Sequence, residues 1–200
     1  MKAGFLACAL ALAAAALLGA APLARIQAIL ARPKVLCGRF DQSKQLVGLK
    51  KPVTSNGRFC VVAEKGVLWR SLQPFPATVK LTRDQIIQMQ GERVTSRLDA
   101  EREPAVQMIH SVVFALLAGD LAPLEKLFVI EGDVHENSWS VTLKAREPGL
   151  AKVLGGIALE GGVFVKGITI SEASGDLTKI VFSAIQTGEG AMSADEAALF

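Results

Sequence analysis

Apolar and polar residues alternate along much of the chain, which is the pattern of strands with one buried face. Between residues 35 and 63 the alternation has a period of two, and it puts Phe40 and Gln42 on the same face. The sequence Thr-Ser-Asn-Gly at residues 54–57 is typical of a hairpin turn. A returning strand is therefore predicted to begin near Phe59.

The same pattern predicts a series of further short strands. They are expected at residues 67–72, around Val79 and Leu81, around Ile86, Ile87 and Met89, and at 128–134, 139–145, 156–159, 164–171 and 177–186. Proline bends and glycine pairs separate them, for example Gly155-Gly156. Successive short strands joined by short turns predict an antiparallel meander in one domain.

Three segments have helical character instead. Ile26, Ile29 and Leu30 form one apolar face of a helix that Pro33 ends. A longer helix is predicted over residues 104–118, because Pro104 suits the first helical position and acidic residues precede it. Residues 120–126 are expected to form a short helix capped by an aspartate.

The predicted helix at residues 104–118 is apolar nearly all round, so it must be buried over most of its circumference. Four of its side chains line one face: Val106, Ile109, Val113 and Leu117. It is too short to cross a membrane.

The N-terminus has the form of a secretory signal. Lys2 precedes the unbroken apolar run at residues 3–18, and small residues follow up to Ala24. Ala21 and Ala24 both offer a cleavage site. We expect cleavage after Ala24, which makes residues 1–24 a signal peptide and residues 25–200 the mature domain. An uncleaved anchor is the alternative, because residues 3–24 could just span a bilayer.

Once Cys8 is removed with the signal, Cys37 and Cys60 remain. Two cysteines in an oxidising compartment favour a disulfide. A turn at residues 54–57, however, would put Cys60 opposite Leu49, tens of ångströms along the strand from Cys37. The sequence therefore predicts two separate, buried, unpaired cysteines.

Composition and motifs limit the chemistry. Half of the residues are apolar, the formal net charge is only +3, and the basic residues are scattered, so nucleic acid is not expected as a partner. The chain has none of the usual nucleophile, zinc-protease, nucleotide or dinucleotide motifs, so we expect a non-enzymatic protein without catalytic residues or cofactor. Glu131, Asp133 and His135 share one strand face, but a solvent-facing charged surface explains them, so no metal is predicted.

Large apolar side chains are concentrated in two predicted elements. One is the helix at residues 104–118, and the other is the strand face that carries Phe40, Phe59, Val67, Trp69 and Val79. An ordinary core around a central helix would explain both. A helix that covers an apolar lipid cavity would explain them equally.

The order of several motifs resembles the periplasmic outer-membrane lipoprotein carrier (LolA-like) family. They are Phe-Asp-Gln-Ser-Lys at residues 40–44, Ser-Asn-Gly at 55–57, Gly66 through Trp69 to Pro74, and the strand-turn-strand sequence at 168–182. The resemblance implies a mainly β fold: an incomplete, half-open antiparallel β-barrel with a short helical lid. It also implies a periplasmic monomer that carries acylated lipoproteins from an inner-membrane transporter to an outer-membrane acceptor.

The resemblance also implies candidate cavity residues, which are Phe40, Phe59, Val67, Trp69, Val79, Leu81, Val106, Ile109, Val113 and Leu117. One position departs from the family: an arginine that ties the lid to the barrel is replaced by Ala63, beside Glu64. The chain thus resembles a divergent LolA-related branch, whose cargo could be another envelope lipid such as a polyene or fatty-acyl ester. An envelope accessory protein with a solid core is the competing interpretation, and a lipid-ester hydrolase is a third.

Overall fold

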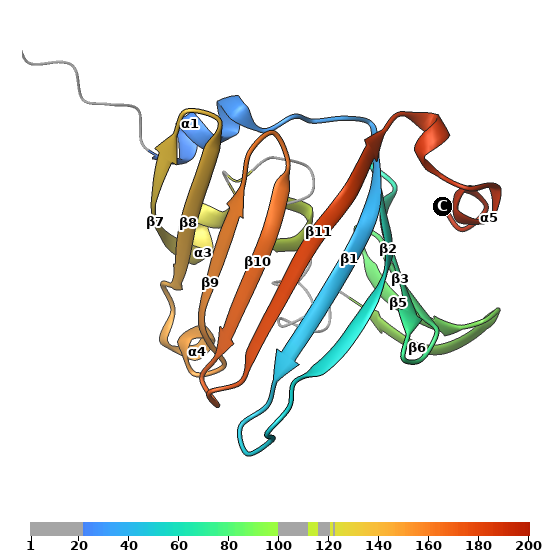
Figure 1. Cartoon of the computed structure of the whole chain (residues 1–200), viewed down its shortest axis with the longest axis horizontal. Helices are drawn as coiled ribbons and strands as arrows, with labels where there is room; N and C mark the ends of the chain where they lie inside the picture. Colours follow the sequence, from blue (N-terminus) through green and yellow to red (C-terminus); the bar gives the residue numbers. More distant parts are fainter. Residues whose placement is uncertain (1–21, 100–111, 116–120, 122) are drawn as a thin grey trace, which may run out of the picture.

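The computed structural model describes residues 22–99, 112–115, 121 and 123–200. They form one 11-stranded antiparallel sheet with the order β6-β5-β4-β3-β2-β1-β11-β10-β9-β8-β7 (Figure 1). The edge strands β6 and β7 do not pair with each other, so the sheet is curved and open. The predicted mainly β, half-open antiparallel architecture is confirmed.

Except at the connection between the first two strands, the strand bounds agree closely with the alternation in the sequence. They are β1 Val35–Gln45, β2 Val53–Val62, β3 Gly66–Gln73, β4 Ala77–Leu81, β5 Gln85–Gln90, β6 Arg93–Asp99, β7 Phe128–His135, β8 Ser138–Ala145, β9 Leu154–Gly161, β10 Val165–Glu172 and β11 Leu177–Thr187. The strand β6 was not predicted from the sequence, because it is an edge strand whose residues are mostly polar and exposed.

Short helices accompany the sheet: α1 Pro22–Ile29, α3 Leu124–Leu127, α4 Pro148–Ala151, a 3₁₀ turn Glu189–Ala191 and α5 Ala194–Ala197. The apolar face of α1 is confirmed, since Ile26 and Leu30 are buried against the sheet. The short helix expected at residues 120–126 instead spans Leu124–Leu127, because Pro123 is its N-cap. Of the helix predicted at 104–118, residues 112–115 are helical and the others lie outside the described residues.

The expected hairpin turn at residues 54–57 is wrong. These residues lie inside β2, where Gly57 is opposite Phe40, and the connection is at residues 46–52. A Cβ atom on Gly57 would lie 1.9 Å from the Arg70 carbonyl oxygen and 2.9 Å from the Phe40 ring. The glycine is therefore needed because β3 and an aromatic ring approach closely, and it does not mark a turn.

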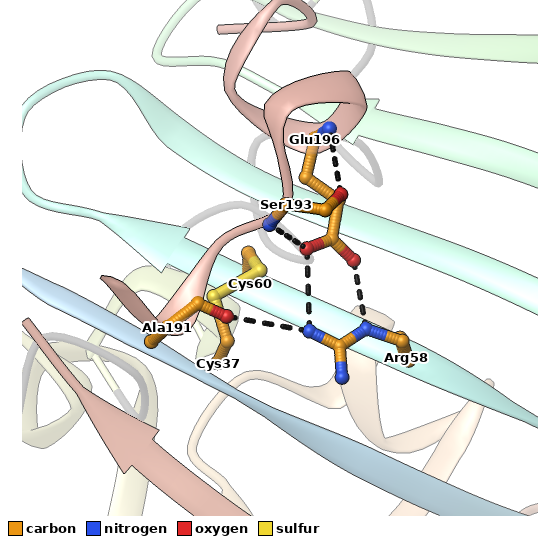
Figure 2. The surroundings of a disulfide bond; sticks show 6 residues. All are labelled: Cys37, Arg58, Cys60, Ala191, Ser193 and Glu196. Carbon is orange, nitrogen blue, oxygen red and sulfur yellow. Dashed lines mark hydrogen bonds and ion pairs between the residues drawn. A yellow bond between two sulfur atoms is a disulfide. The ribbon is translucent and has the colours of Figure 1, made fainter. Parts of the chain in front are cut away.

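The expectation of unpaired cysteines is wrong for the same reason. With the turn at residues 46–52, Cys37 is directly opposite Cys60, and the two form a disulfide across β1 and β2 (Figure 2). Both cysteines are 1% exposed on the outer face of the sheet. Displacing the turn by several residues thus changed a pair that seemed tens of ångströms apart into direct neighbours.

The C-terminal segment, residues 188–200, covers this disulfide. Ser193 and Glu196 form a capping box at the start of α5. Arg58 also donates two hydrogen bonds to the Glu196 carboxylate, from Nε at 2.8 Å and from Nη2 at 3.2 Å (Figure 2). The Glu196 side chain is 2% exposed. Burial alone raises the pKa of Glu196, but the hydrogen bonds from Arg58 and the Ser193 backbone outweigh burial and hold that pKa below its ordinary value.

Candidate functional site: the inner face of the sheet

The strand register collects aromatic side chains on the inner, concave face of the sheet. Phe40 on β1 is opposite Phe182 on β11, and Phe59 on β2 is opposite Trp69 on β3. Because side chains alternate between the two faces, all four residues project to the same side, away from the disulfide. This aromatic cluster, Phe40, Phe59, Trp69 and Phe182, spans four neighbouring strands.

The rings of the aromatic cluster are in direct contact. Phe40 stacks on Trp69 with ring centroids 3.8 Å apart, and Phe59 meets Phe182 at 4.9 Å. Trp69 and Phe182 meet edge to face at 6.1 Å. Phe40 and Phe59 are 1% and 2% exposed, whereas Trp69 is half-buried. The inner face is therefore filled in this structure, and an apolar ligand would have to displace whatever covers the rings.

Most of the other predicted cavity residues lie beside this cluster. Val67 and Leu81 are buried in the same core, and Val79 is opposite Trp69 on β4. Val113 is partly buried against this core. The remaining three, Val106, Ile109 and Leu117, lie outside the described residues.

Phe182 was not among the predicted cavity residues. Its neighbours Ile180 and Val181 hide the alternation of β11, because Val181 is apolar although it lies on the outer face and is 42% exposed. The pairing of β11 with β1, two strands far apart in sequence, determines that Phe182 joins the cluster.

The inner face becomes polar toward the end where β1 and β2 connect. Gln42 and Lys44 follow Phe40 on the same face of β1, and Thr178 on β11 lies opposite Lys44. Lys44 Nζ donates to a Glu172 carboxylate oxygen at 2.8 Å. This hydrogen bond raises the pKa of Lys44. The inner face thus has an apolar part at the aromatic rings and a polar end at the Lys44–Glu172 ion pair.

A separate hollow of about 420 Å³ lies on the outer face, over β7 to β11, and is lined mainly by polar side chains. Glu131 and Asp133, two of the residues considered as metal ligands, line this hollow, and Glu131 receives Lys144 Nζ at 2.8 Å. In the part of the chain that is described, the one group of three residues with metal-like spacing consists of both disulfide cysteines and Glu196. A disulfide offers no thiolate to a metal, so that group is not a metal centre.

An open, curved antiparallel sheet with an apolar inner face defines a half-barrel fold. The chain belongs to the outer membrane lipoprotein carrier protein LolA-like family, whose model matches residues 13–199. Family membership confirms the resemblance seen in the sequence, and this family consists of carrier or binding proteins. No helix of the described residues is long and apolar enough to cross a membrane.

The chain is similar to several solved structures at low sequence identity. A DUF1329 family protein from Desulfovibrio piger is 10% identical with a TM-score of 0.51, and the match covers 89% of this chain and 96% of that one. A LolA superfamily protein from Nitrosomonas europaea is 7% identical, with a TM-score of 0.45 and coverage of 84% and 92%. The MucA/MucB complex of Pseudomonas aeruginosa matches at 13% identity and a TM-score of 0.48, covering 87% and 60%. No curated protein matches the sequence.

Proposed function

We propose that this protein is a periplasmic carrier that binds the acyl chains of lipoproteins on its inner face and moves them from the inner to the outer membrane. The observation that carries the proposal is the cluster of Phe40, Phe59, Trp69 and Phe182 on the concave side of an open sheet. Burying acyl chains there would gain roughly 0.8 kcal/mol per methylene. The partners would be an inner-membrane transporter and an outer-membrane acceptor.

A covering element that competes with the lipid would allow the cargo to be released. Phe40 and Phe59 are fully covered, and Val112 and Ala115 from the helical residues 112–115 belong to the same buried core. A segment that leaves this core when lipid enters would weaken net lipid affinity by its own burial energy. We propose that the helix predicted at residues 104–118 is this lid.

The inner-face test compares two charge substitutions on opposite faces of the sheet. Trp69→Glu places a carboxylate on the inner face, and Val181→Glu places one on the outer face, where the side chain is already 42% exposed. Binding of a diacylated lipopeptide should weaken at least tenfold in Trp69→Glu, because a buried charge opposes acyl chains. Val181→Glu should bind as the wild type does, and both variants should retain the β-sheet circular-dichroism spectrum.

Each result has a definite meaning. Equal lipopeptide binding by the two folded variants would show that the inner face is not the binding site. A wild type that binds a fatty-acyl ester and not the lipopeptide would favour the alternative cargo. A wild type that binds neither ligand would favour an envelope accessory protein with a solid core.

The lid test uses Val112→Ala, because Val112 is 9% exposed in the core. The substitution should lower the unfolding free energy by about 1–2 kcal/mol and tighten lipopeptide binding, since the lid competes less well. Destabilisation with unchanged or weaker lipopeptide affinity would show that this segment is ordinary core.

We also propose that the protein is exported and its signal peptide cleaved, and the intact mass of protein purified from the envelope tests this. Loss of about two dozen residues would support a cleaved signal. Cleavage after Ala24 would remove Leu23, which is 5% exposed in the core, whereas cleavage after Ala21 would retain it. A full-length mass in the membrane fraction would contradict the cleaved form.

A further inference from the structure

Exposed aliphatic side chains gather at one end of the sheet. The connection between β1 and β2 and the start of β2, residues 46–53, form a projecting hairpin tip that extends beyond the neighbouring β10–β11 turn (Figure 1). On this tip Val47 is 69% exposed, Leu49 50% and Val53 51%. At the opposite end of the sheet, Val163 is the one large exposed hydrophobic residue in the connections that the structure describes.

Neighbouring segments extend the apolar surface of the tip. Leu177, 42% exposed, pairs with Gln45 at the base of the hairpin. Val153, 68% exposed, follows α4, and its carbonyl oxygen accepts the Ala173 backbone N–H at 3.0 Å. The exposed aliphatic residues thus come from three connections at the same end of the sheet.

The backbone of the tip is held by internal hydrogen bonds. Gln45 Nε2 donates to the Leu49 carbonyl oxygen at 2.6 Å, and the Leu49 N–H donates to the Leu46 carbonyl oxygen at 3.1 Å. The Val47 N–H donates to Asp176 Oδ1 at 2.8 Å. These hydrogen bonds pair the backbone N–H groups of both Val47 and Leu49, which lowers the cost of placing this part of the loop in a low-dielectric interface.

Cationic side chains surround these apolar residues. Lys50 and Lys51 are exposed on the tip, Lys152 precedes Val153, and no ion pair is recorded for the three lysines within the described ranges. The nearby carboxylates of Glu172 and Asp176 are engaged, the first by Lys44 and the second by the tip backbone. The local charge on the tip itself is therefore positive.

We propose that the hairpin tip is a contact site for an anionic phospholipid surface. Val47, Leu49 and Val53 would enter the interface, while Lys50 and Lys51 would bind headgroup phosphates. A projecting tip with flexible cations around aliphatic side chains fits a deformable anionic surface, because the lysine stems can follow the interface while the ammonium groups stay hydrated. A protein partner would need an acidic, apolar groove that receives a projecting loop.

The position of the tip connects this contact to the inner face. Lys44 and Gln42 lie between the tip and Phe40 along β1, so the polar end of the inner face is next to the proposed membrane contact. An amphiphile that leaves the bilayer at this end would pass the Lys44–Glu172 pair before it reaches the aromatic cluster. Membrane contact does not depend on cargo binding, however, and the two can be tested separately.

The experiment is co-sedimentation of the full mature chain with vesicles of phosphatidylcholine alone or with 30 mol% phosphatidylglycerol. The wild type should bind the anionic vesicles and bind less at high salt. Lys50→Gln/Lys51→Gln should weaken this binding about 30-fold, taking about 1 kcal/mol per lysine near an anionic surface. Leu49→Ser should weaken it about tenfold, because less apolar area enters the interface.

Val163→Ser is the matched control, since Val163 is an equally exposed valine (51%) at the opposite end of the sheet. It should bind anionic vesicles as the wild type does. Val47→Ser replaces Leu49→Ser if the latter fails to fold.

Absence of wild-type binding to anionic vesicles would overturn the proposal. Equal losses in Leu49→Ser and Val163→Ser would also overturn it. Undiminished vesicle binding by the folded tip variants would do so too, because the membrane contact would then lie elsewhere on the protein.

Discussion

Removing the Cys37–Cys60 disulfide tests the strand register on which the fold depends. The perturbation is Cys37→Ala/Cys60→Ala, a double change that leaves no free thiol. The two cysteines are 23 residues apart in sequence, so the bridge closes a loop of about two dozen residues in the unfolded chain. In the chain-entropy account, removing a disulfide that closes a loop of that length lowers the unfolding free energy by about 3.4 kcal/mol.

The assay is equilibrium urea unfolding of the mature chain, followed by circular dichroism. The double variant should have a lower midpoint and a slightly larger dependence on urea, because its unfolded state is less constrained. Wild-type protein unfolded in the presence of a reductant is the control, since it loses the bridge and keeps both sulfur atoms. The two samples should agree within about 1 kcal/mol.

Alkylation of the cysteines tests directly whether the disulfide is present. In denaturant without reductant, an alkylating agent should leave both cysteines unmodified in the wild type. Alkylation of both, or a stability loss below about 1 kcal/mol in the double variant, would refute the assigned register. The C-terminal segment should also slow reduction in the native state, because both cysteines are 1% exposed beneath it.

Three other predictions concern local packing and charge. The pKa of Glu196 is lower in the folded state than its ordinary value of 4.5. The stability that its carboxylate contributes is therefore fully present above pH 4.5 and is lost as the pH falls through the folded pKa. Glu196→Gln should therefore flatten the acid side of the stability-pH curve, and an unchanged slope would contradict the ion pair. Gly57→Ala should cost several kcal/mol in urea unfolding, because its Cβ would lie 1.9 Å from a backbone oxygen, whereas Gly149→Ala, with nothing within 4 Å, should cost little. Lys144→Ala, in an ion pair whose side chains are more than half exposed, should change stability by less than about 1 kcal/mol, and a larger loss would contradict a solvent-screened pair.

Local sequence pattern determined most of the strands and the nature of the site. Period-two alternation predicted β3 to β5 and β7 to β11, and the existence but not the bounds of β1 and β2, because one face of each strand packs on a core and the other meets solvent. It also placed Phe40, Phe59 and Trp69 on a common face. The order of the family motifs then predicted the half-open sheet, which neither composition nor periodicity could supply.

Tertiary structure decided what depends on register and on contacts between distant segments. The Thr-Ser-Asn-Gly sequence at residues 54–57 has turn propensity, but close packing of β3 and of the Phe40 ring requires Gly57 inside a strand. Because the turn lies at residues 46–52 and not at 54–57, Cys37 is opposite Cys60 and the two can form a disulfide; a shift in register changes which residues are opposite each other. Phe182 and Glu196 likewise acquire their roles from strands and loops more than 100 residues away, and propensity along the chain carries no information about such partners.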